Sequence, residues 1–189
     1  MKIGVGNFPL IILYVLTTLI CGYLGARNFK IQLTDTKCTH KPKYASSVSC
    51  SLSEPAPSTG TSYYLQMKRQ VKDFRMDVMM FVERSKKFFL LFKAADIDVC
   101  KEFHSNVTIM YLQLIKNITL DAGSWPHCPV PENYFYKFEN MTPNAEYLPS
   151  YLPQVGFKFV IDLKDKKEVF MDLSIFGKIV YNKKRRIAS

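Results

Sequence analysis

The 189-residue sequence lacks the short motifs that mark common catalytic centres. It contains no GxSxG nucleophile elbow, no HExxH zinc motif and no glycine-rich phosphate loop. It also has no CxxC or HxxxH pair, and its three histidines, His40, His104 and His127, are scattered, so no metal site is expected. The sequence therefore predicts a protein that is not an enzyme and needs no cofactor.

Two weaker candidates for acid–base chemistry have simpler interpretations. Asp96 and Asp98 flank the predicted end of a strand, where carboxylates usually face water. His104 has no identifiable nucleophile beside it, so a solvated or capping role is favoured over catalysis.

The N-terminal segment carries a single charged residue, Lys2, followed by an apolar run from Phe8 to Cys21. Small residues up to Ala26 follow this run, so the pattern predicts a signal peptide over residues 1–26. The run is short for a transmembrane helix, which needs roughly 20 apolar residues, and a signal anchor is the less favoured alternative. The mature protein is expected to be secreted and extracellular.

The rest of the chain has the composition of one packed domain, with 48% hydrophobic and 14% aromatic residues over the whole sequence. We expect the domain over residues 27–182 and a basic tail over residues 183–189, without internal repeats. The formal charge of +10 favours acidic partners such as anionic lipid head groups, sulfated sugars or cell surfaces. A solvated basic surface is the simpler interpretation. Secretion excludes nucleic acid as a partner.

Four cysteines, Cys38, Cys50, Cys100 and Cys128, remain after the signal peptide is removed. An even number in a secreted chain predicts two disulfides, for which three connectivities are possible. Bridges Cys38–Cys50 and Cys100–Cys128 are favoured because each closes a short loop. In the chain-entropy model such loops are worth roughly 3 kcal/mol each.

An amphipathic helix is expected between the last two cysteines, within residues 100–128. Its apolar residues recur with a spacing of three or four, which places them on one helical face: Phe103, Val107, Met110, Tyr111, Leu114, Ile115 and Ile118. Asn106 and Asn117 begin Asn-x-Thr sequons and lie about 20° apart around an ideal helix. A third sequon begins at Asn140 and is followed by Pro143. All three asparagines are predicted glycosylation sites.

Alternating apolar and polar residues, or short apolar runs, predict strands in eight segments: 29–37, 48–52, 63–72, 76–84, 86–94, 133–140, 157–163 and 169–175. The three consecutive strands between residues 63 and 94 are expected to form an antiparallel meander. The segment 165–167 is predicted to be the turn of a hairpin. Together these segments predict a mainly β fold, an antiparallel two-sheet sandwich or cup, immunoglobulin-like in general architecture, with one inserted amphipathic α-helix.

An ordered set of landmarks crosses about residues 28–182. A cysteine closes a strand, an amphipathic helix ends in asparagine, and a Cys-Pro pair, a tyrosine-rich strand, two Leu-Pro pairs and a Gly-aromatic pair follow. These landmarks are Cys100, Asn117, Cys128-Pro129, Leu148-Pro149, Leu152-Pro153 and Gly156-Phe157. In this order they resemble a large insect family of small secreted proteins, well populated in flies, that is labelled as a domain of unknown function.

That family is similar to the ML lipid-recognition domains, which include the ganglioside activator and the Niemann-Pick type C sterol carrier. Some of its members are linked to contact chemosensation of cuticular hydrocarbons. The resemblance implies a β-sandwich whose sheets part to hold an apolar ligand.

Methionine and aromatic residues are abundant, and flexible thioethers and flat rings adapt to irregular apolar ligands. An ordinary sandwich core is the simpler interpretation of these residues. The candidate ligand-pocket residues are Met80, Phe88, Phe92, Met110, Leu114, Phe157 and Phe159. We expect a secreted, non-catalytic, lipid-binding protein whose partner is an apolar molecule such as a lipid, fatty acid or hydrocarbon, with a chemosensory role and a membrane surface or receptor as further expectations. The alternative is a glycosylated extracellular interaction protein without a small-molecule ligand.

Overall fold

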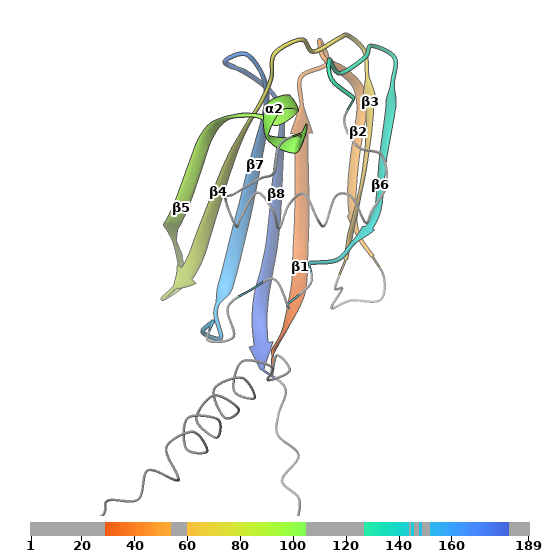
Figure 1. Ribbon diagram of the computed structural model, residues 1–189. Coiled ribbons are helices and arrows are strands. Elements are labelled where there is room, and N and C mark those ends of the chain that lie inside the picture. The colour runs from red at the N-terminus through yellow and green to blue at the C-terminus, as the bar shows by residue number, and fades with distance from the viewer. Residues whose placement is uncertain are drawn as a thin grey trace, which may run out of the picture.

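Two antiparallel β-sheets make up most of the described part of the chain (Figure 1). The computed structural model describes residues 29–53, 60–104, 127–143, 145, 148 and 152–181. The strands in these ranges are β1 (Phe29–His40), β2 (Ala45–Leu52), β3 (Thr61–Met67), β4 (Phe74–Arg84), β5 (Lys87–Asp98), β6 (Phe135–Met141), β7 (Gly156–Asp165) and β8 (Glu168–Tyr181).

One sheet has five strands in the order β1-β8-β7-β4-β5, and the other has three in the order β2-β3-β6. The predicted mainly β, two-sheet antiparallel architecture is therefore confirmed. A six-residue helix, α2 (Val99–His104), follows β5 directly. The remainder of the helix expected before Cys128 falls on residues 105–126, outside the described residues. Within the described ranges, no helix has the length and apolar character needed to span a membrane.

Two of the predicted strand patterns are confirmed in detail. Phe29, Ile31 and Leu33 alternate with more exposed neighbours and are buried on one face of β1. Strands β7 and β8 form the predicted hairpin, in which Asp165 pairs with Glu168. Lys166 in its turn has a φ of 57°, as a tight two-residue hairpin turn requires.

The predicted meander is wrong, because β3 belongs to the three-stranded sheet while β4 and β5 belong to the other. The strand predicted over residues 63–72 also ends earlier, at Met67. Beyond it the chain crosses between the sheets, fixed by a hydrogen bond from the Lys68 amide to the Tyr44 carbonyl and by a bridge between Val71 and Val130. Residue alternation shows which face of a strand is buried, but it does not show which sheet the strand joins.

The two sheets share a hydrophobic core at the end of the molecule where α2 lies (Figure 1). Leu65, Met67 and Tyr136 of the small sheet pack there with residues of the large sheet. The other buried members, from β2, β4, β5, α2, β8 and the adjoining turns, are Tyr44, Ala45, Val71, Phe74, Met76, Val78, Ile97, Val99, Val130, Phe170 and Met171. Stacking of the Tyr44 and Phe170 rings, with centroids 5.2 Å apart, closes this end.

Both disulfides connect parts of the chain that belong to different sheets. Cys38 on β1 is bonded to Cys50 on β2, with Cα atoms 6.2 Å apart. Cys100 in α2, which follows β5, is bonded to Cys128, which precedes β6, with Cα atoms 5.7 Å apart. These are the two pairings that the sequence favoured. Each bridge therefore holds the small sheet against the large one.

The outer face of the large sheet, turned away from the small sheet, carries a row of three carboxylates. Asp77, Asp162 and Asp172 are register neighbours on β4, β7 and β8. Lys164 forms a 2.5 Å ion pair with Asp77, which also accepts a hydrogen bond from the Asp96 amide. Although burial opposes ionisation, these two partners lower the pKa of Asp77. Burial raises the pKa of Asp162 to about 6, and the hydrogen bond and charge of Asp172 act in the same direction.

Asp162 is expected to make the protein less stable at neutral pH than in mild acid. The pKa of Asp162 in the folded protein is about 6, above the ordinary value of 3.8. The stabilisation that comes from this raised pKa is fully present below pH 3.8 and is lost as the pH rises through about 6. We expect Asp162→Asn to raise the free energy of unfolding at pH 7.5 by up to about 1 kcal/mol, because solvent screens this half-buried group. Urea unfolding at pH 5 and pH 7.5 measures the change. Asp35→Asn, which removes an exposed ion pair with Lys37, serves as the control. If the wild type and both variants show the same pH dependence of stability, the raised pKa of Asp162 is contradicted.

Candidate ligand-binding face

The inner face of the large sheet is the face turned toward the small sheet. Strand register arranges its side chains in four rows that run across β5, β4, β7 and β8. From the shared core outward, these rows are Ile97-Met76-Leu163-Met171, Ala94-Val78-Ile161-Leu173, Phe92-Met80-Phe159-Ile175 and Phe89-Val82-Phe157-Gly177. Apart from the glycine, every member is apolar.

Burial decreases along these rows from the shared core toward the β4–β5 hairpin. In the first two rows Met76, Val78 and Met171 are buried. In the third row all four side chains are only half-buried. In the fourth row Phe89 is 52% exposed. The strands of the three-stranded sheet are shorter, with seven or eight residues each. The small sheet therefore packs against only part of the inner face of the large sheet.

We call the half-buried apolar residues of the third and fourth rows the apolar face. Its members are Met80, Val82, Phe92, Phe157, Phe159 and Ile175. Gly177 beside it has no room for a side chain, because a Cβ atom there would meet the Phe157 ring and would lie 2.8 Å from the Gln32 carbonyl oxygen. The glycine therefore lets the Phe157 ring lie against β8.

Four of the seven residues predicted to line a ligand pocket, Met80, Phe92, Phe157 and Phe159, come together on the apolar face. Met110 and Leu114 lie outside the described residues. Phe88 lies on the opposite side of the sheet, where it pairs with Glu83 and its ring contacts Phe176 with centroids 6.2 Å apart. Its assignment to the same pocket is wrong.

A β-bulge explains the position of Phe88. Phe92 pairs with Met80, but Leu90 pairs with the next residue, Phe81, so Leu91 is an extra residue in β5. The extra residue reverses the alternation, and Phe89 takes the inward direction that simple alternation gives to Phe88. Val82 and Ile175 of the apolar face were not among the predicted pocket residues, although both continue the alternating patterns of their strands.

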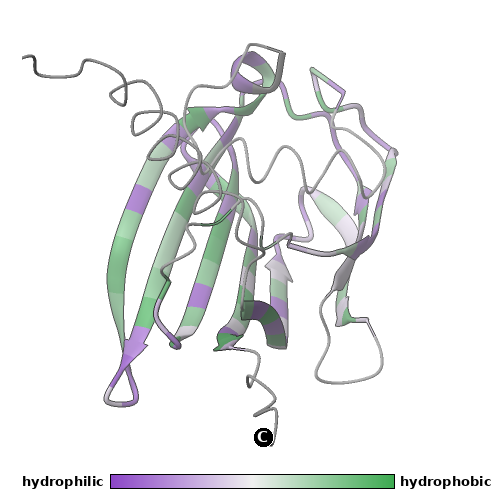
Figure 2. Ribbon diagram, turned by 60° about the horizontal axis from the view of Figure 1, so that its bottom comes forward, coloured by the Kyte–Doolittle hydropathy of each residue, from purple (hydrophilic) through white to green (hydrophobic). Residues whose placement is uncertain are grey.

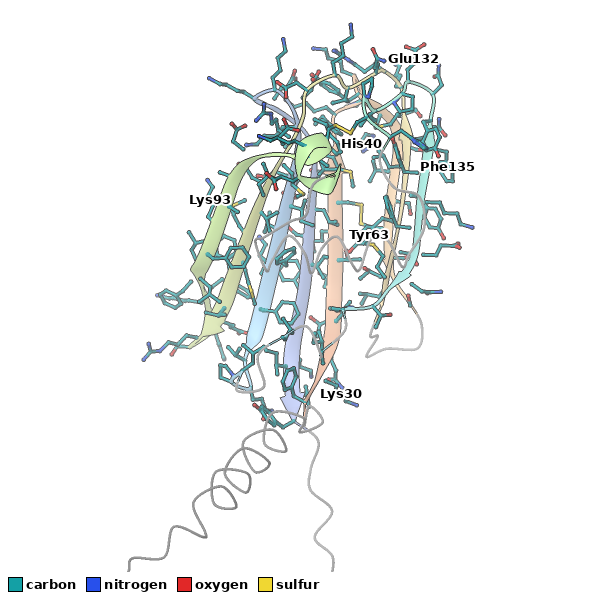
Figure 3. The ribbon with its side chains drawn as sticks, viewed as in Figure 1. Lys30, His40, Tyr63, Lys93, Glu132 and Phe135 are labelled. Carbon is teal, nitrogen blue, oxygen red and sulfur yellow. A yellow bond between two sulfur atoms is a disulfide. The ribbon has the colours of Figure 1, made fainter. Side chains whose placement is uncertain are left out.

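The small sheet contributes two buried phenols to the interior. Tyr63, which lies between the sheets in Figure 3, has its hydroxyl 3.2 Å from Thr36 Oγ1, and burial raises its pKa. Burial likewise raises the pKa of Tyr136 to about 12, while the nearby His127 backbone lowers it. Within the described part of the chain, the buried Tyr136 hydroxyl has no hydrogen-bond partner. The interior thus offers apolar surface and neutral hydroxyls.

The acidic pair considered for catalysis is bound in a local ion-pair group. Arg75 lies 3.7 Å from Asp96 and 3.8 Å from Asp98, and it also contacts Asp73 at 2.7 Å. The Asp96 side chain is 70% exposed. Nowhere in the described ranges do three or more His, Cys, Asp or Glu side chains gather as metal ligands would.

Of the three sequon asparagines, Asn140 is described, and Asn106 and Asn117 lie outside the described residues. Asn140 is exposed near the end of β6. Its Oδ1 accepts a 2.8 Å hydrogen bond from Ser53, and its backbone carbonyl accepts one from Thr142, the last residue of the sequon. Glycosylation at all three positions stays a prediction.

The sequence and the fold of this chain are each similar to known proteins. Residues 74–159 match a family model described as "Protein of unknown function (DUF1091)". Among curated proteins, none matches the sequence. Among solved structures, the fold is similar to a Niemann-Pick type C2 protein from the Japanese carpenter ant, at 12% identity, with 82% of this chain and 95% of that chain covered and a TM-score of 0.34.

Gly177→Ala is expected to destabilise the fold by about 1–3 kcal/mol, because the added methyl group would force β1 or Phe157 to move. Chemical unfolding measures the loss. Gly60→Ala is the control, since its nearest contacts are hydroxyls at 3.1 Å that can rotate away. If both substitutions lower the free energy of unfolding equally, the close packing of Phe157 on β8 is contradicted.

Proposed function

We propose that this protein is a non-catalytic binding protein that holds an apolar ligand, such as a lipid, fatty acid or hydrocarbon, against the apolar face. The observation that supports the proposal is the row Phe92-Met80-Phe159-Ile175. Its four neighbouring side chains are large and apolar, face the interior, and are nevertheless only half-buried. Covering a surface of this kind with an apolar molecule is favourable, because apolar area is removed from water.

The expected strength of binding follows from the area that a ligand would cover. Each buried methylene contributes about 0.8 kcal/mol. About fifteen methylenes contribute about 12 kcal/mol. After an association cost of about 4 kcal/mol, about 8 kcal/mol remains, which corresponds to micromolar affinity. Because the apolar face has no charged member, ligand length and width should govern selectivity more than hydrogen bonding.

The residue types suit a ligand of variable shape. Met80 can change its side-chain conformation at little cost, while the rings of Phe92, Phe157 and Phe159 supply flat contact area. The Tyr136 hydroxyl, buried in the core that both sheets share, is a polar group that a ligand reaching from the apolar face into this core would meet.

The proposed place of action is outside the cell. The predicted signal peptide, two disulfides and three sequons support secretion, because disulfides persist in oxidising compartments. A hydrocarbon ligand with a chemosensory role, and a membrane surface or receptor as a further partner, belong to the same proposal. Nucleic acid is not a partner in this proposal, because a secreted protein does not meet it in its compartment.

A fluorescent fatty acid tests the proposal. The delipidated, secreted protein should bind an anthroyloxy-labelled stearate with micromolar Kd. Phe159→Ala should raise this Kd about tenfold, because it removes apolar contact area worth about 1–2 kcal/mol. The matched control is Phe135→Ala, since Phe135 is 48% exposed on the outer face of the small sheet (Figure 3).

Native mass spectrometry of the secreted protein provides the second measurement. A co-purified lipid mass supports the proposal. A clean apo mass, with no displacement of the fluorescent probe by any lipid class, contradicts it and favours the alternative of a glycosylated extracellular interaction protein that acts through its surface.

Secretion itself is expected to add glycans at Asn106, Asn117 and Asn140. Each Asn→Gln substitution should then lower the mass of the protein secreted from insect or mammalian cells by one glycan, as measured by intact mass before and after peptide N-glycosidase treatment. An unmodified secreted chain would contradict these assignments. A chain that retains residues 1–26 would contradict the predicted cleavage.

A further inference from the structure

The end of the molecule opposite the shared core carries four consecutive exposed apolar residues. Phe88, Phe89, Leu90 and Leu91 are 44%, 52%, 53% and 58% exposed. Apart from Phe135 and Tyr181, they are the exposed large hydrophobic residues of the described chain. Consecutive residues of a strand point to opposite faces, so both faces of β5 are uncovered here. An exposed apolar stretch of this size marks an interaction surface.

The same segment is strongly basic. The sequence from residue 84 to residue 93 is RSKKFFLLFK, which contains four cations and no acidic residue. Within the described part of the chain, Arg84, Lys86 and Lys87 form no ion pair. The nearest acidic residue along the strand, Glu83, lies against Gly156, where its carboxylate would meet an added Cβ atom. The partner that fits this surface is therefore both apolar and anionic.

A stiff turn presents these residues. Arg84 pairs with Lys87 across the two-residue turn Ser85-Lys86, and both turn residues have positive φ angles, 52° and 63°. This backbone is that of a type I′ turn, which matches the twist of the two strands and holds them together. Figure 2 shows the hydrophilic turn projecting at the end of β4 and β5, with the hydrophobic part of β5 behind it.

A second copy of this chain fits the surface less well. β5 is the last strand in the order of the large sheet, so another strand could pair with it. Antiparallel pairing of two β5 strands centred on the apolar stretch 88–92 would, however, place Lys87 of one copy opposite Lys93 of the other, and cations on an edge strand oppose such pairing. An anionic lipid surface has no such conflict. Its acyl region accepts the four apolar side chains, while the flexible lysine stems let the ammonium groups remain among the head groups.

We propose that the β4–β5 hairpin docks this protein onto membranes that contain anionic lipids. The outer face extends the contact, because Lys158 lies over the rings of Phe81 and Phe176, 5.9 Å and 5.5 Å from their centroids. Docking does not depend on the proposed ligand. If the ligand-binding proposal holds, docking also places the hairpin end of the inner face, at Val82 and Phe89, next to the bilayer. A lipid could then enter the protein from the bilayer at this end.

Vesicle co-sedimentation of the full secreted chain tests the docking. The protein should bind vesicles of phosphatidylcholine with phosphatidylserine, bind phosphatidylcholine alone at least about tenfold more weakly, and lose affinity as salt is raised. The double substitution Lys86→Glu with Lys87→Glu should weaken binding about tenfold or more. The matched control is Lys68→Glu with Lys72→Glu, an equal change of charge in the exposed β3–β4 connection at the opposite end, which should change binding less than about threefold.

A second pair of variants tests the apolar contribution. Phe88→Ser should weaken vesicle binding about five- to tenfold. Phe135→Ser should leave it unchanged, although the two rings are matched in exposure, 44% and 48%, and each lies 6.2 Å from another ring. Thermal unfolding confirms that each variant is folded. Anthroyloxy-stearate binding without vesicles should be unchanged in every hairpin variant, which separates failure of docking from failure of the ligand proposal.

Three outcomes would overturn the docking proposal. One is absence of wild-type binding to the phosphatidylserine vesicles. Another is equal loss in the hairpin and control variants, which would indicate a response to net charge alone. The third is a dimer that light scattering detects in the wild type and that Phe88→Ser abolishes, which would assign the surface to a second copy of the chain.

Discussion

Contact between the two sheets at one end of the molecule is the constraint on which the rest of the structure depends. There Met67, Val71 and Phe170 are almost completely buried, and the two disulfides join the sheets across the same half of the fold. The cross-links keep a three-stranded sheet of short strands against a larger one. Because the small sheet cannot cover the whole inner face, apolar side chains farther from the core are only half-buried. The candidate ligand-binding face is thus a consequence of unequal sheets.

The exposed end of the large sheet combines two properties within a few residues. Its inner side continues the apolar face through Val82 and Phe157, and its hairpin presents Phe88, Leu90 and lysines to the surroundings. Binding of an apolar ligand and attachment to an anionic bilayer would then take place at neighbouring positions. The outer row of Asp77, Asp162 and Asp172 lies on the other side of the same sheet, where burial raises the pKa of Asp162.

Local patterns predicted the strands well and the pairing of strands less well. The alternation in residues 157–163 and 169–175 predicted the β7–β8 hairpin, because a short turn leaves neighbouring strands no other convenient partner. The same reasoning failed for β3, which belongs to the small sheet, because the chain crosses to the large sheet after Met67. It also failed for Phe88, because the extra residue Leu91 reverses the alternation between Phe92 and residues 88–90. A bulge changes register without leaving a signal in an apolar run such as FFLLF.

The sequence by itself determined the mainly β architecture, the alternating buried faces and the local pairing of the four cysteines, since each depends on residues close together in the chain. It also indicated Met80, Phe92, Phe157 and Phe159 as candidates. Only the tertiary structure decided that these four share one face, that Phe88 lies opposite them, and which end of that face is left half-buried. Those properties depend on strand order, register and the relative lengths of two sheets, which join residues far apart in the chain.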